Sequence, residues 1–338
     1  MPSTDVVVIG ASAGGIEALQ QLCAGLPANL PAAILVVMHV SPYSDALLPR
    51  LLNRVGPLPA VHPKDGETIR KGKIYIAPPD LHMVVEDGHV RLVHGPRENH
   101  NRPAIDPTFR SAAMARGNHV IGVVLTGLLD DGTAGLTVIR AHGGDAVVQD
   151  PETAMFPSMP KNALQRVPDA HVSSLAEMPS LLSRLLSEKR GSETTSHQIP
   201  DEVTKAQVRS SELDMSELQN ENRPGIPSEF GCPECGGVLW EHDENGMWQF
   251  RCRVGHAYTA RHLKVEQRQA VEAALWSALR ALEESVSLYR RMADRARSSN
   301  HTETTKKFEE RVATQEENAK VLREFLLHLG QNEDEEAS

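Results

Sequence analysis

Side chains from three distant parts of the chain could together catalyse acyl transfer: Ser12, His39 and one of the pair Asp130 and Asp131. Ser12 is the central residue of positions 10–14, GASAG, which fit the G-x-S-x-G pattern of a nucleophile on a sharp strand-to-helix turn. Histidine exchanges protons readily near neutral pH, so His39 could accept the hydroxyl proton. A carboxylate could orient the imidazole and stabilise its cation. These residue types predict a Ser-His-Asp triad.

A competing pattern in the same segment is the dinucleotide fingerprint G-x-G-x-x-G, of which Gly10 and Gly15 are present. The middle glycine, which lets the backbone approach a pyrophosphate, is replaced by Ser12. The fingerprint also requires an acidic residue about twenty positions further on to hold a ribose. The second apolar run instead ends at His39 in "VVMHVSP". Neither the middle glycine nor the acidic residue of the fingerprint is present, so a nucleotide site is disfavoured.

Each candidate also has a purely structural explanation. Ser12 could cap the first helix, and His39 could be a hydrogen-bonded histidine at a strand end. Asp130 and Asp131 could cap a later helix and occupy its first turn. All these residues follow apolar runs, and the carboxyl ends of such runs would meet at one edge of a parallel sheet. Their common position favours a catalytic role over the separate structural explanations.

A second chemical cluster lies late in the chain, where Cys232-x-x-Cys235 is followed by Cys252 and His256. A Cys-x-x-Cys pair on a turn rich in Pro and Gly, closed by a second pair of ligands, suits tetrahedral Zn²⁺. A Cys3His set leaves no open position, so we expect a structural zinc and no cofactor for catalysis. Two alternatives stay open: a reduced thiol pair without metal, and His242 as the fourth ligand.

The elements that must position the triad are predicted to form one α/β domain over residues 1–188. Its near-continuous apolar runs, "DVVVIG", "AAILVVMHV" and "HVIGVVLTG", predict central parallel strands covered on both faces. The alternating segment "KIYIAPPDLHMVVEDGHVRLVHG" contains Asp-Gly and predicts an antiparallel hairpin at the sheet edge. Helical patterns lie between these runs, over residues 15–26, 107–116, 133–142, 160–167 and 176–188.

The rest of the chain divides by composition into four parts. Residues 189–226 are polar and show no sustained period, so we expect a flexible linker. Residues 227–260 form the zinc-ribbon-like module, which is too small to fold without a staple such as a metal. Residues 261–330 carry apolar stripes at helical spacing on both sides of "SSNHTE" and predict an antiparallel helical hairpin. Residues 331–338 form an acidic tail.

Composition disfavours several classes of protein. The net charge of −10 argues against a nucleic-acid or membrane-surface partner, because both are polyanionic. No apolar run is long enough to span a bilayer, and the first residues lack the features of a signal peptide. Three of the four cysteines cluster at metal-ligand spacing, so we expect a reducing cytoplasm and no disulfide framework.

Six stretches resemble, in the family's order, the catalytic domain of the CheB-type chemotaxis methylesterases over about residues 4–187. These stretches are "VVVIGASAGGIEAL", "VVMHV", "IYIAPPDLHM", "NRPAIDPTFRSAA", "VVLTGLLDDGTAG" and "VVQDPETAMFPSMPKNAL". The resemblance implies a doubly wound α/β domain with Ser12 as the nucleophile and His39 as the base. The family's "TGM-x-x-DG" places the aspartate directly before the glycine, which selects Asp131 over Asp130.

The resemblance also implies the reaction: hydrolysis of glutamate γ-methyl esters on chemoreceptor helices, and deamidation of glutamine there. In the implied mechanism, His39 takes the proton as Ser12 attacks the ester carbonyl and then activates water. Matching segments place four further residues where they could line the cleft: Arg102, Ser158, Met159 and Pro160. Arg102 could equally be a surface or packing residue.

The sequence departs from the family at three points. Ala13 stands where the family often has Thr, and Leu128 stands where it usually has Met. Backbone N–H donors do not depend on side-chain identity, so an oxyanion hole could survive both changes. Family members often carry a phosphorylatable receiver domain ahead of the catalytic strand. This chain begins at that strand, so we expect no regulation by phosphorylation in cis.

Two function hypotheses follow. The first is a cytoplasmic methylesterase or deamidase whose partner is the helical region of a methylated chemoreceptor-like protein. The second is a regulatory or binding module of a chemosensory-like pathway that recruits a partner through the zinc module and the helical hairpin. The hairpin could pack on itself, on the zinc module or on a second copy of the chain. The presence of Ser12, His39 and Asp131 together favours the first hypothesis.

Overall fold

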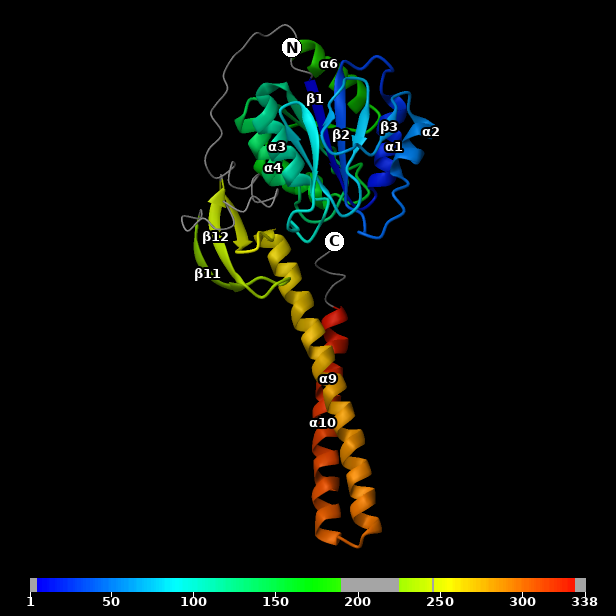
Figure 1. The fold of residues 1–338 in the computed structure, drawn as a ribbon, viewed down its shortest axis with the longest axis vertical. Helices are drawn as coiled ribbons and strands as arrows, with labels where there is room; N and C mark the ends of the chain where they lie inside the picture. The colour runs from blue at the N-terminus through cyan, green and yellow to red at the C-terminus, as the bar shows by residue number, and fades with distance from the viewer. Residues whose placement is uncertain (1–4, 190–224, 245, 332–338) are drawn as a thin grey trace. The chain divides into compact units, whose positions relative to one another are not determined.

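The computed structural model describes residues 5–189, 225–244 and 246–331 (Figure 1). The chain divides into two compact units, residues 1–263 and 264–338. The predicted linker at 189–226 and the predicted acidic tail at 331–338 lie, apart from their end residues, outside the described residues.

The first unit is built around a seven-stranded sheet in which every pairing is parallel. The strand order is β10-β9-β8-β1-β2-β5-β3. Its strands are β1 (Asp5–Ala11), β2 (Ala32–Met38), β3 (Ala60–Val61), β5 (Ile74–Ile76), β8 (Val120–Val124), β9 (Asp145–Gln149) and β10 (His171–Ser173). β1 and β2 are buried along their whole length, as their continuous apolar sequences predict.

Helices cover both faces of this sheet. Alternate side chains of β1 point to opposite faces, so Val7 and Ile9 pack in one core with α1, α2 and α6, whereas Val6 and Val8 pack in another with α3, α4 and α5. The helices are α1 (Gly15–Gly25), α2 (Leu48–Val55), α3 (Ile105–Arg116), η1 (Gly117–His119, a 3-10 turn), α4 (Thr133–Ala141), α5 (Ser158–Arg166) and α6 (Met178–Lys189). This arrangement confirms the predicted doubly wound α/β fold.

The direction of winding reverses at the centre of the sheet. From β1 the chain proceeds to β2, β3 and β5 on one side, and it then crosses to β8, β9 and β10 on the other side. The carboxyl ends of β2, β1 and β8 therefore lie side by side at the point where a doubly wound sheet opens a crevice. Ser12, His39 and the aspartate pair follow these three strands.

The predicted antiparallel hairpin is present, and it belongs to a separate three-stranded sheet of order β4-β7-β6. The strands are β4 (Glu67–Thr68), β6 (His82–Glu86) and β7 (His89–Val93). The turn between β6 and β7 uses Asp87 and Gly88, both at positive φ, as Asp-Gly predicts. The hairpin packs on α3, where Ser111 Oγ accepts the N–H of Val85 over 3.0 Å.

A four-stranded antiparallel sheet carries the late cysteines. Its order is β11-β12-β13-β14, with β11 (Ile226–Gly231), β12 (Val238–Glu244), β13 (Met247–Cys252) and β14 (Ala257–Thr259). Its core is small and consists of Leu239, Phe250, Tyr258 and Leu263 around Cys232 and Cys252. So small a core supports the expectation of an additional staple.

Two long helices follow, α9 (Ala260–Ser298) and α10 (Thr302–Gln331), joined by a three-residue turn. Leu279, Ala319 and Leu326 are their buried contacts. No helix in the described part of the chain combines the length and the apolar character that crossing a membrane requires.

Candidate active site

Ser12 is placed by the sharp turn that joins β1 to α1. Its N–H donates a hydrogen bond to the carbonyl of Thr126 over 3.0 Å. The residue that caps α1 is Gly14, whose φ of 70° lies in the left-handed region, and no side chain bonds to this cap. The alternative in which Ser12 caps the helix is therefore wrong, and its hydroxyl is available to another partner.

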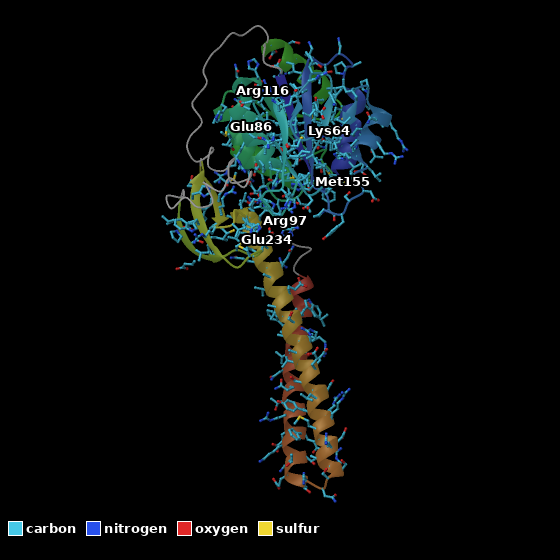
Figure 2. All side chains as sticks on the ribbon, in the orientation of Figure 1. Lys64, Glu86, Arg97, Arg116, Met155 and Glu234 are labelled. Carbon is cyan, nitrogen blue, oxygen red and sulfur yellow. The ribbon has the colours of Figure 1, made fainter. Side chains whose placement is uncertain are left out.

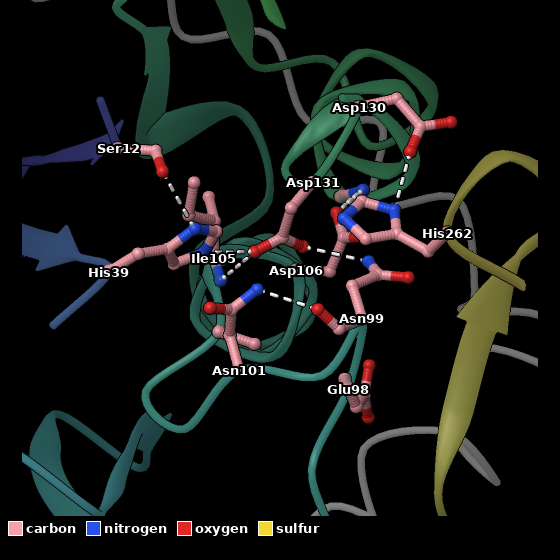
Figure 3. A network of polar contacts seen from close by, with 12 residues as sticks. Ser12, His39, Glu98, Asn99, Asn101, Ile105, Asp106, Asp130, Asp131 and His262 are labelled. Carbon is pink, nitrogen blue, oxygen red and sulfur yellow. Dashed lines mark hydrogen bonds and ion pairs between the residues drawn. The ribbon is translucent and has the colours of Figure 1, made fainter. Parts of the chain in front are cut away.

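His39, which follows β2, is that partner. Its Nδ1 lies 3.1 Å from Ser12 Oγ and its Nε2 lies 2.7 Å from Asp131 Oδ2, so the three side chains form one hydrogen-bonded chain (Figure 3). An ionised carboxylate can only accept, so Nε2 carries the proton that is donated to Asp131. This tautomer leaves Nδ1 unprotonated, facing the Ser12 hydroxyl whose proton it can accept.

Asp131 is completely buried and is surrounded by donors. Its Oδ2 also accepts the N–H of Ile105 over 2.8 Å, and its Oδ1 accepts the side-chain amide of Asn99 over 3.0 Å. Burial by itself would raise the pKa of Asp131, but the hydrogen bond and charge of His39, with the Ile105 N–H, hold that pKa below its ordinary value. Asp131 is therefore ionised at neutral pH and its charge faces His39.

Asp130, the neighbouring aspartate, has different partners. Its Oδ1 accepts hydrogen bonds from Thr259 Oγ1 and His262 Nδ1, each over 2.8 Å. Helix α4 is capped by Gly132 without any side-chain hydrogen bond, so neither aspartate serves as the predicted helix cap. The structure thus joins Asp131, and not Asp130, to Ser12 and His39.

Two residues that sequence reasoning missed hold the nucleophile turn. Thr126 Oγ1 donates to the carbonyl of Ala13 over 3.0 Å and accepts the N–H of Phe156 over 2.8 Å. A Cβ on Gly127 would lie 2.9 Å from the Cβ of Ser12, so only glycine fits there. The signal that could have found them is the Thr-Gly pair directly after an apolar run that ends beside β1.

Two backbone donors follow Ser12 in the chain. Among the residues that the structure describes, the N–H groups of Ala13 and Gly14 make no hydrogen bond. Both precede the first turn of α1, where the helix dipole favours negative charge. They are therefore available to an acceptor at this turn.

The other predicted cleft residues have structural contacts. Arg102 forms an ion pair with Asp80, with N–O distances of 3.0 and 2.6 Å, and donates to a backbone carbonyl. Ser158 Oγ donates to the carbonyl of Leu129 over 3.3 Å. Met159 and Pro160 are buried. These contacts show how Arg102 is held, and its role as a cleft residue or as a surface or packing residue stays a prediction.

The four predicted metal ligands come together at the four-stranded antiparallel sheet. One ligand atom from each of Cys232, Cys235, Cys252 and His256 lies within 4.8 Å of the others. The sulfurs of Cys235 and Cys252 are 3.6 Å apart, and His256 Nδ1 is 3.6 and 3.5 Å from the sulfurs of Cys232 and Cys252. Ligand atoms of tetrahedral zinc are about 3.5–3.8 Å apart, given Zn–S and Zn–N bonds of about 2.3 and 2.0 Å. The donor set fits zinc.

Surrounding groups agree with this fit. The Nε2 of His256 lies 3.3 Å from Glu234, and a metal-bound histidine commonly donates its other N–H to a carboxylate. Burial and the neighbouring thiols raise the pKa of Cys252 to about 12, so this thiol stays protonated unless a cation binds. His242, the alternative ligand, lies on β12 outside this group of described ligands.

The fold and the site define the class of this protein. A serine, a histidine and an aspartate, hydrogen-bonded in that order at the carboxyl edge of a parallel sheet, form the arrangement of the serine hydrolases, which occurs on several unrelated folds. In chain order the three residues run Ser, His, Asp, which differs from the Ser, Asp, His order of the α/β-hydrolases.

Comparisons with known proteins give the family. Residues 7–182 match the CheB methylesterase family. The crystal structure of the Thermotoga maritima CheB methylesterase catalytic domain superposes with a TM-score of 0.52 and 34% identity, over 54% of this chain and 99% of that one. The chain therefore belongs to the CheB methylesterase family.

Curated relatives match the same part of the chain. A Leptospira interrogans protein named "Putative protein-glutamate methylesterase/protein-glutamine glutaminase" is 37% identical over 182 residues, which are 54% of this chain and 94% of that protein. The "Protein-glutamate methylesterase/protein-glutamine glutaminase 5" of Anaeromyxobacter dehalogenans is 35% identical over 184 residues, 53% of this chain and 51% of that protein. The chain thus spans nearly all of the first relative and about half of the second.

Proposed function

We propose that this chain is a serine esterase that hydrolyses glutamate γ-methyl esters on chemoreceptor-like proteins and can deamidate glutamine there. Membership of the CheB methylesterase family supports the class of reaction, and two relatives carry both activities in their names. The single observation that carries the proposal is the hydrogen-bonded chain of Ser12, His39 and Asp131 at the centre of the sheet edge.

The first half of the reaction forms an acyl-enzyme. Ser12 Oγ attacks the γ-carbonyl carbon while His39 Nδ1 takes the hydroxyl proton, and Asp131 stabilises the imidazolium through Nε2–H. The N–H groups of Ala13 and Gly14 stabilise the oxyanion. The bond between the carbonyl carbon and the methoxy oxygen then breaks, and methanol leaves with the proton from His39. For a glutamine substrate the leaving group is ammonia.

The second half regenerates Ser12. Water attacks the acyl carbon while His39 takes one of its protons, the bond to Ser12 Oγ breaks, and His39 returns that proton to Ser12. The product is a glutamate γ-carboxylate. Every proton transfer uses the same nitrogen, Nδ1, because Asp131 holds the opposite nitrogen throughout.

The test uses a receptor cytoplasmic domain carrying labelled methyl esters. Wild-type chain should release labelled methanol, and Ser12→Ala should reduce that release to the uncatalysed level. Release by the wild type no greater than by Ser12→Ala would contradict the esterase proposal for this substrate. The same pair, incubated with a receptor domain bearing glutamine, tests deamidation by released ammonia.

A second candidate function is recruitment of a partner through the C-terminal parts. Large apolar side chains on α9 and α10 are exposed, among them Trp276, Leu288 and Phe325, and could contact a partner or a second copy of the chain. Methanol release that depends on Ser12 distinguishes the two candidates. Sedimentation of the purified chain tests whether the helices self-associate.

We also propose that Cys232, Cys235, Cys252 and His256 bind a structural zinc. All four cysteines of the chain are free thiols, which suits a reducing compartment such as the cytoplasm. The chain should purify with one zinc, and Cys232→Ser should lose it, whereas substitution of the distant buried Cys23 by Ser should not. Equal zinc content in the Cys232→Ser variant and the wild type would contradict this ligand set.

A further inference from the structure

A loop of the catalytic domain, residues 97–101, is held by the sheet that carries the zinc ligands. Glu98 and Ala257 form an isolated parallel β-bridge. The N–H of Asn99 donates to the carbonyl of Ala257 over 2.7 Å, and the N–H of Ala257 donates to the carbonyl of Arg97 over 3.2 Å. The loop is therefore attached along the backbone of β14, as a short additional strand would be.

Asn99 connects this contact to the triad. Its side chain is buried, its Oδ1 accepts the N–H of Thr259 over 2.9 Å, and its Nδ2 donates to Asp131 Oδ1 over 3.0 Å (Figure 3). A backbone N–H can only donate, so the amide oxygen must face Thr259 and the amide nitrogen must face Asp131. The orientation of the Asn99 side chain is thus decided by β14.

Asp130 is a second connection between the same elements. Its carboxylate accepts from Thr259 Oγ1 and from His262 Nδ1, and all three side chains are buried. Thr259 therefore bonds to both neighbours of the catalytic carboxylate, through its N–H to Asn99 and through its hydroxyl to Asp130. The segment from Thr259 to His262 lies directly against the backbone that carries Asp131.

A buried ion pair strengthens the attachment. The carboxylate of Glu98 bonds to Arg110 of α3 and, over 3.1 Å, to Arg251 of β13. Glu98 and Arg110 are almost completely buried. Removing one partner of such a pair leaves an uncompensated buried charge, so the contact resists separation.

The zinc ligands lie in the same segment of chain. His256 immediately precedes Ala257, and its carbonyl accepts the N–H of the ligand Cys252 over 3.0 Å. His256 Nε2 also lies 3.3 Å from Glu234, whose carboxylate accepts the hydroxyl of Tyr258 over 3.2 Å and lies 3.6 Å from Arg97 (Figure 2). Two ligands and the loop that carries Asn99 are thus linked by backbone and by charge.

We propose that the Cys3His module is a positioning part of the active site, in which β14 holds Asn99 and Asn99 holds Asp131 against His39. Zinc binding then sets the reactivity of Ser12, because the metal shapes the segment of residues 252–259 that contacts the loop. The inference rests on the proposed function, since it takes Ser12, His39 and Asp131 as the triad.

Positioning matters because Asp131 must present one oxygen to His39. The Ile105 N–H and His39 share Oδ2, and Asn99 is the described donor to Oδ1, so it fixes the rotation of the carboxylate. Without this donor the carboxylate of Asp131 keeps only its bonds at Oδ2 and is held less firmly, and more negative charge remains on it to stabilise the imidazolium of His39. A carboxylate that is held less firmly orients the imidazole less well. A more stable imidazolium leaves less of the unprotonated imidazole that accepts the Ser12 proton at low pH, so both effects slow labelling there.

Two variants of Asn99 distinguish its contact with Asp131 from its contact with β14. Asn99→Asp keeps the oxygen that accepts the Thr259 N–H and replaces the donor to Asp131 by a second carboxyl oxygen, which repels Asp131, whereas Asn99→Ala removes both groups. The readout is the rate at which a fluorophosphonate probe labels Ser12, because labelling needs the triad but not the natural substrate. Ser228→Ala, which removes a hydroxyl bonded to Leu239 at the β11–β12 edge, is the matched control.

Both Asn99 variants should label about 10- to 100-fold more slowly than the wild type, the range for loss of one hydrogen bond to a charged group. The acid limb of the labelling pH profile should move to higher pH, a shift that a merely structural role would not cause. Ser228→Ala should label at the wild-type rate. Circular dichroism of each variant verifies the fold.

Zinc provides the second arm of the test. The full-length chain is stripped with a chelator, reconstituted with ZnCl₂ and labelled in both states. Stripping should slow labelling of the wild type to about the rate of Asn99→Ala, and ZnCl₂ should restore it. Asn99→Asp should respond little to zinc, because the link between the module and Asp131 is already broken.

The outcomes are distinguishable. A reactive Ser12 that labels equally in the wild type, in Asn99→Asp and in the stripped chain would overturn this inference alone. A wild-type Ser12 that never labels would overturn the proposed triad, and this inference with it. Slower labelling of Asn99→Asp with a shifted acid limb supports the proposal.

Discussion

At the scale of the residue, two adjacent aspartates have separate tasks. Asp131 contacts His39, whereas Asp130 contacts Thr259 and His262. Both residues lie in the loop between β8 and α4, where one side chain faces His39 and the other faces the segment of residues 259–262. A carboxylate acts on its immediate partner, which makes the two positions experimentally separable.

The first prediction concerns this pair. Asp131→Asn should lower kcat for methyl-ester hydrolysis by about 10⁴-fold, because an amide cannot hold the imidazole in the required tautomer, and this is the size of the effect in a serine protease triad. Asp130→Asn keeps an acceptor for Thr259 and should cause a much smaller loss. Steady-state kinetics of both variants measures the difference, and equal losses would count against Asp131 as the triad carboxylate.

Thr126 supports the turn that carries the nucleophile. Its hydroxyl bonds to the backbone on both sides, at Ala13 and at Phe156. Thr126→Val should leave these groups without partners, destabilise the domain by about 1–3 kcal/mol and lower kcat, because the Ser12 turn loses its support. Thr126→Ser retains the hydroxyl and should stay close to the wild type in thermal unfolding and in ester hydrolysis. If Thr126→Val and Thr126→Ser behaved identically, the Thr126 hydroxyl would not be needed to support the Ser12 turn.

At the scale of the element, α3 brings a second carboxyl group under the site. Asp106 is buried in the first turn of α3, where its Oδ1 accepts the N–H of Gly135 over 2.7 Å. Burial, with repulsion from Asp131, raises the pKa of Asp106 well above its ordinary value. The packing of α3 on α4 therefore includes a carboxyl group whose ionisation is unfavourable.

Asp106→Asn should for this reason stabilise the protein near neutral pH. A carboxyl whose pKa is raised by folding contributes stability below its unfolded value, about 4, and loses that stability as pH rises through the folded pKa. Asparagine keeps the acceptor for Gly135 without charge. Near neutral pH, the unfolding temperature of Asp106→Asn should exceed that of the wild type by about 2–4 °C for each kcal/mol gained in the free energy of unfolding. Near pH 4 the two unfolding temperatures should be equal. Thermal melts from pH 4 to pH 8 test this, and a difference independent of pH would refute it.

At the scale of the whole molecule, the chain consists of two compact units. The residues of the proposed triad and zinc site all belong to the first unit, and the second unit has a small core of its own around Leu279. Stability of the helical hairpin and reactivity of Ser12 should therefore respond to different substitutions.

Leu279→Ala tests this separation. The substitution removes one of the few buried side chains of the hairpin and should destabilise it by about 2–4 kcal/mol. The hairpin should become sensitive to a protease while ester hydrolysis by the first unit is unchanged. Parallel measurements of proteolysis and methanol release compare the two, and a matching loss of esterase activity would show that the units act together.

Much of the fold could be predicted because its determinants are local. Continuous apolar runs identified the buried parallel strands, and the turn chemistry of Asp87 and Gly88 identified the hairpin. The short helix α2, residues 48–55, was not predicted, because eight residues barely cover two helical turns and its start has no side-chain cap. The pairing of the hairpin with β4 was also not predicted, since that contact depends on a strand of two residues.

The sequence by itself determined the residues of the proposed triad and of the zinc site. Ser12, His39 and the aspartates each follow an apolar run, and the four proposed zinc ligands have the spacing of known zinc sites. Only the tertiary structure decided which buried residues hydrogen-bond to these site residues and to their neighbours. Asn99 meets Thr259 across 160 positions of sequence, and Asp130 meets His262 across 132. No local pattern encodes such contacts. They form where segments distant in the sequence pack together and their buried polar groups must be hydrogen-bonded.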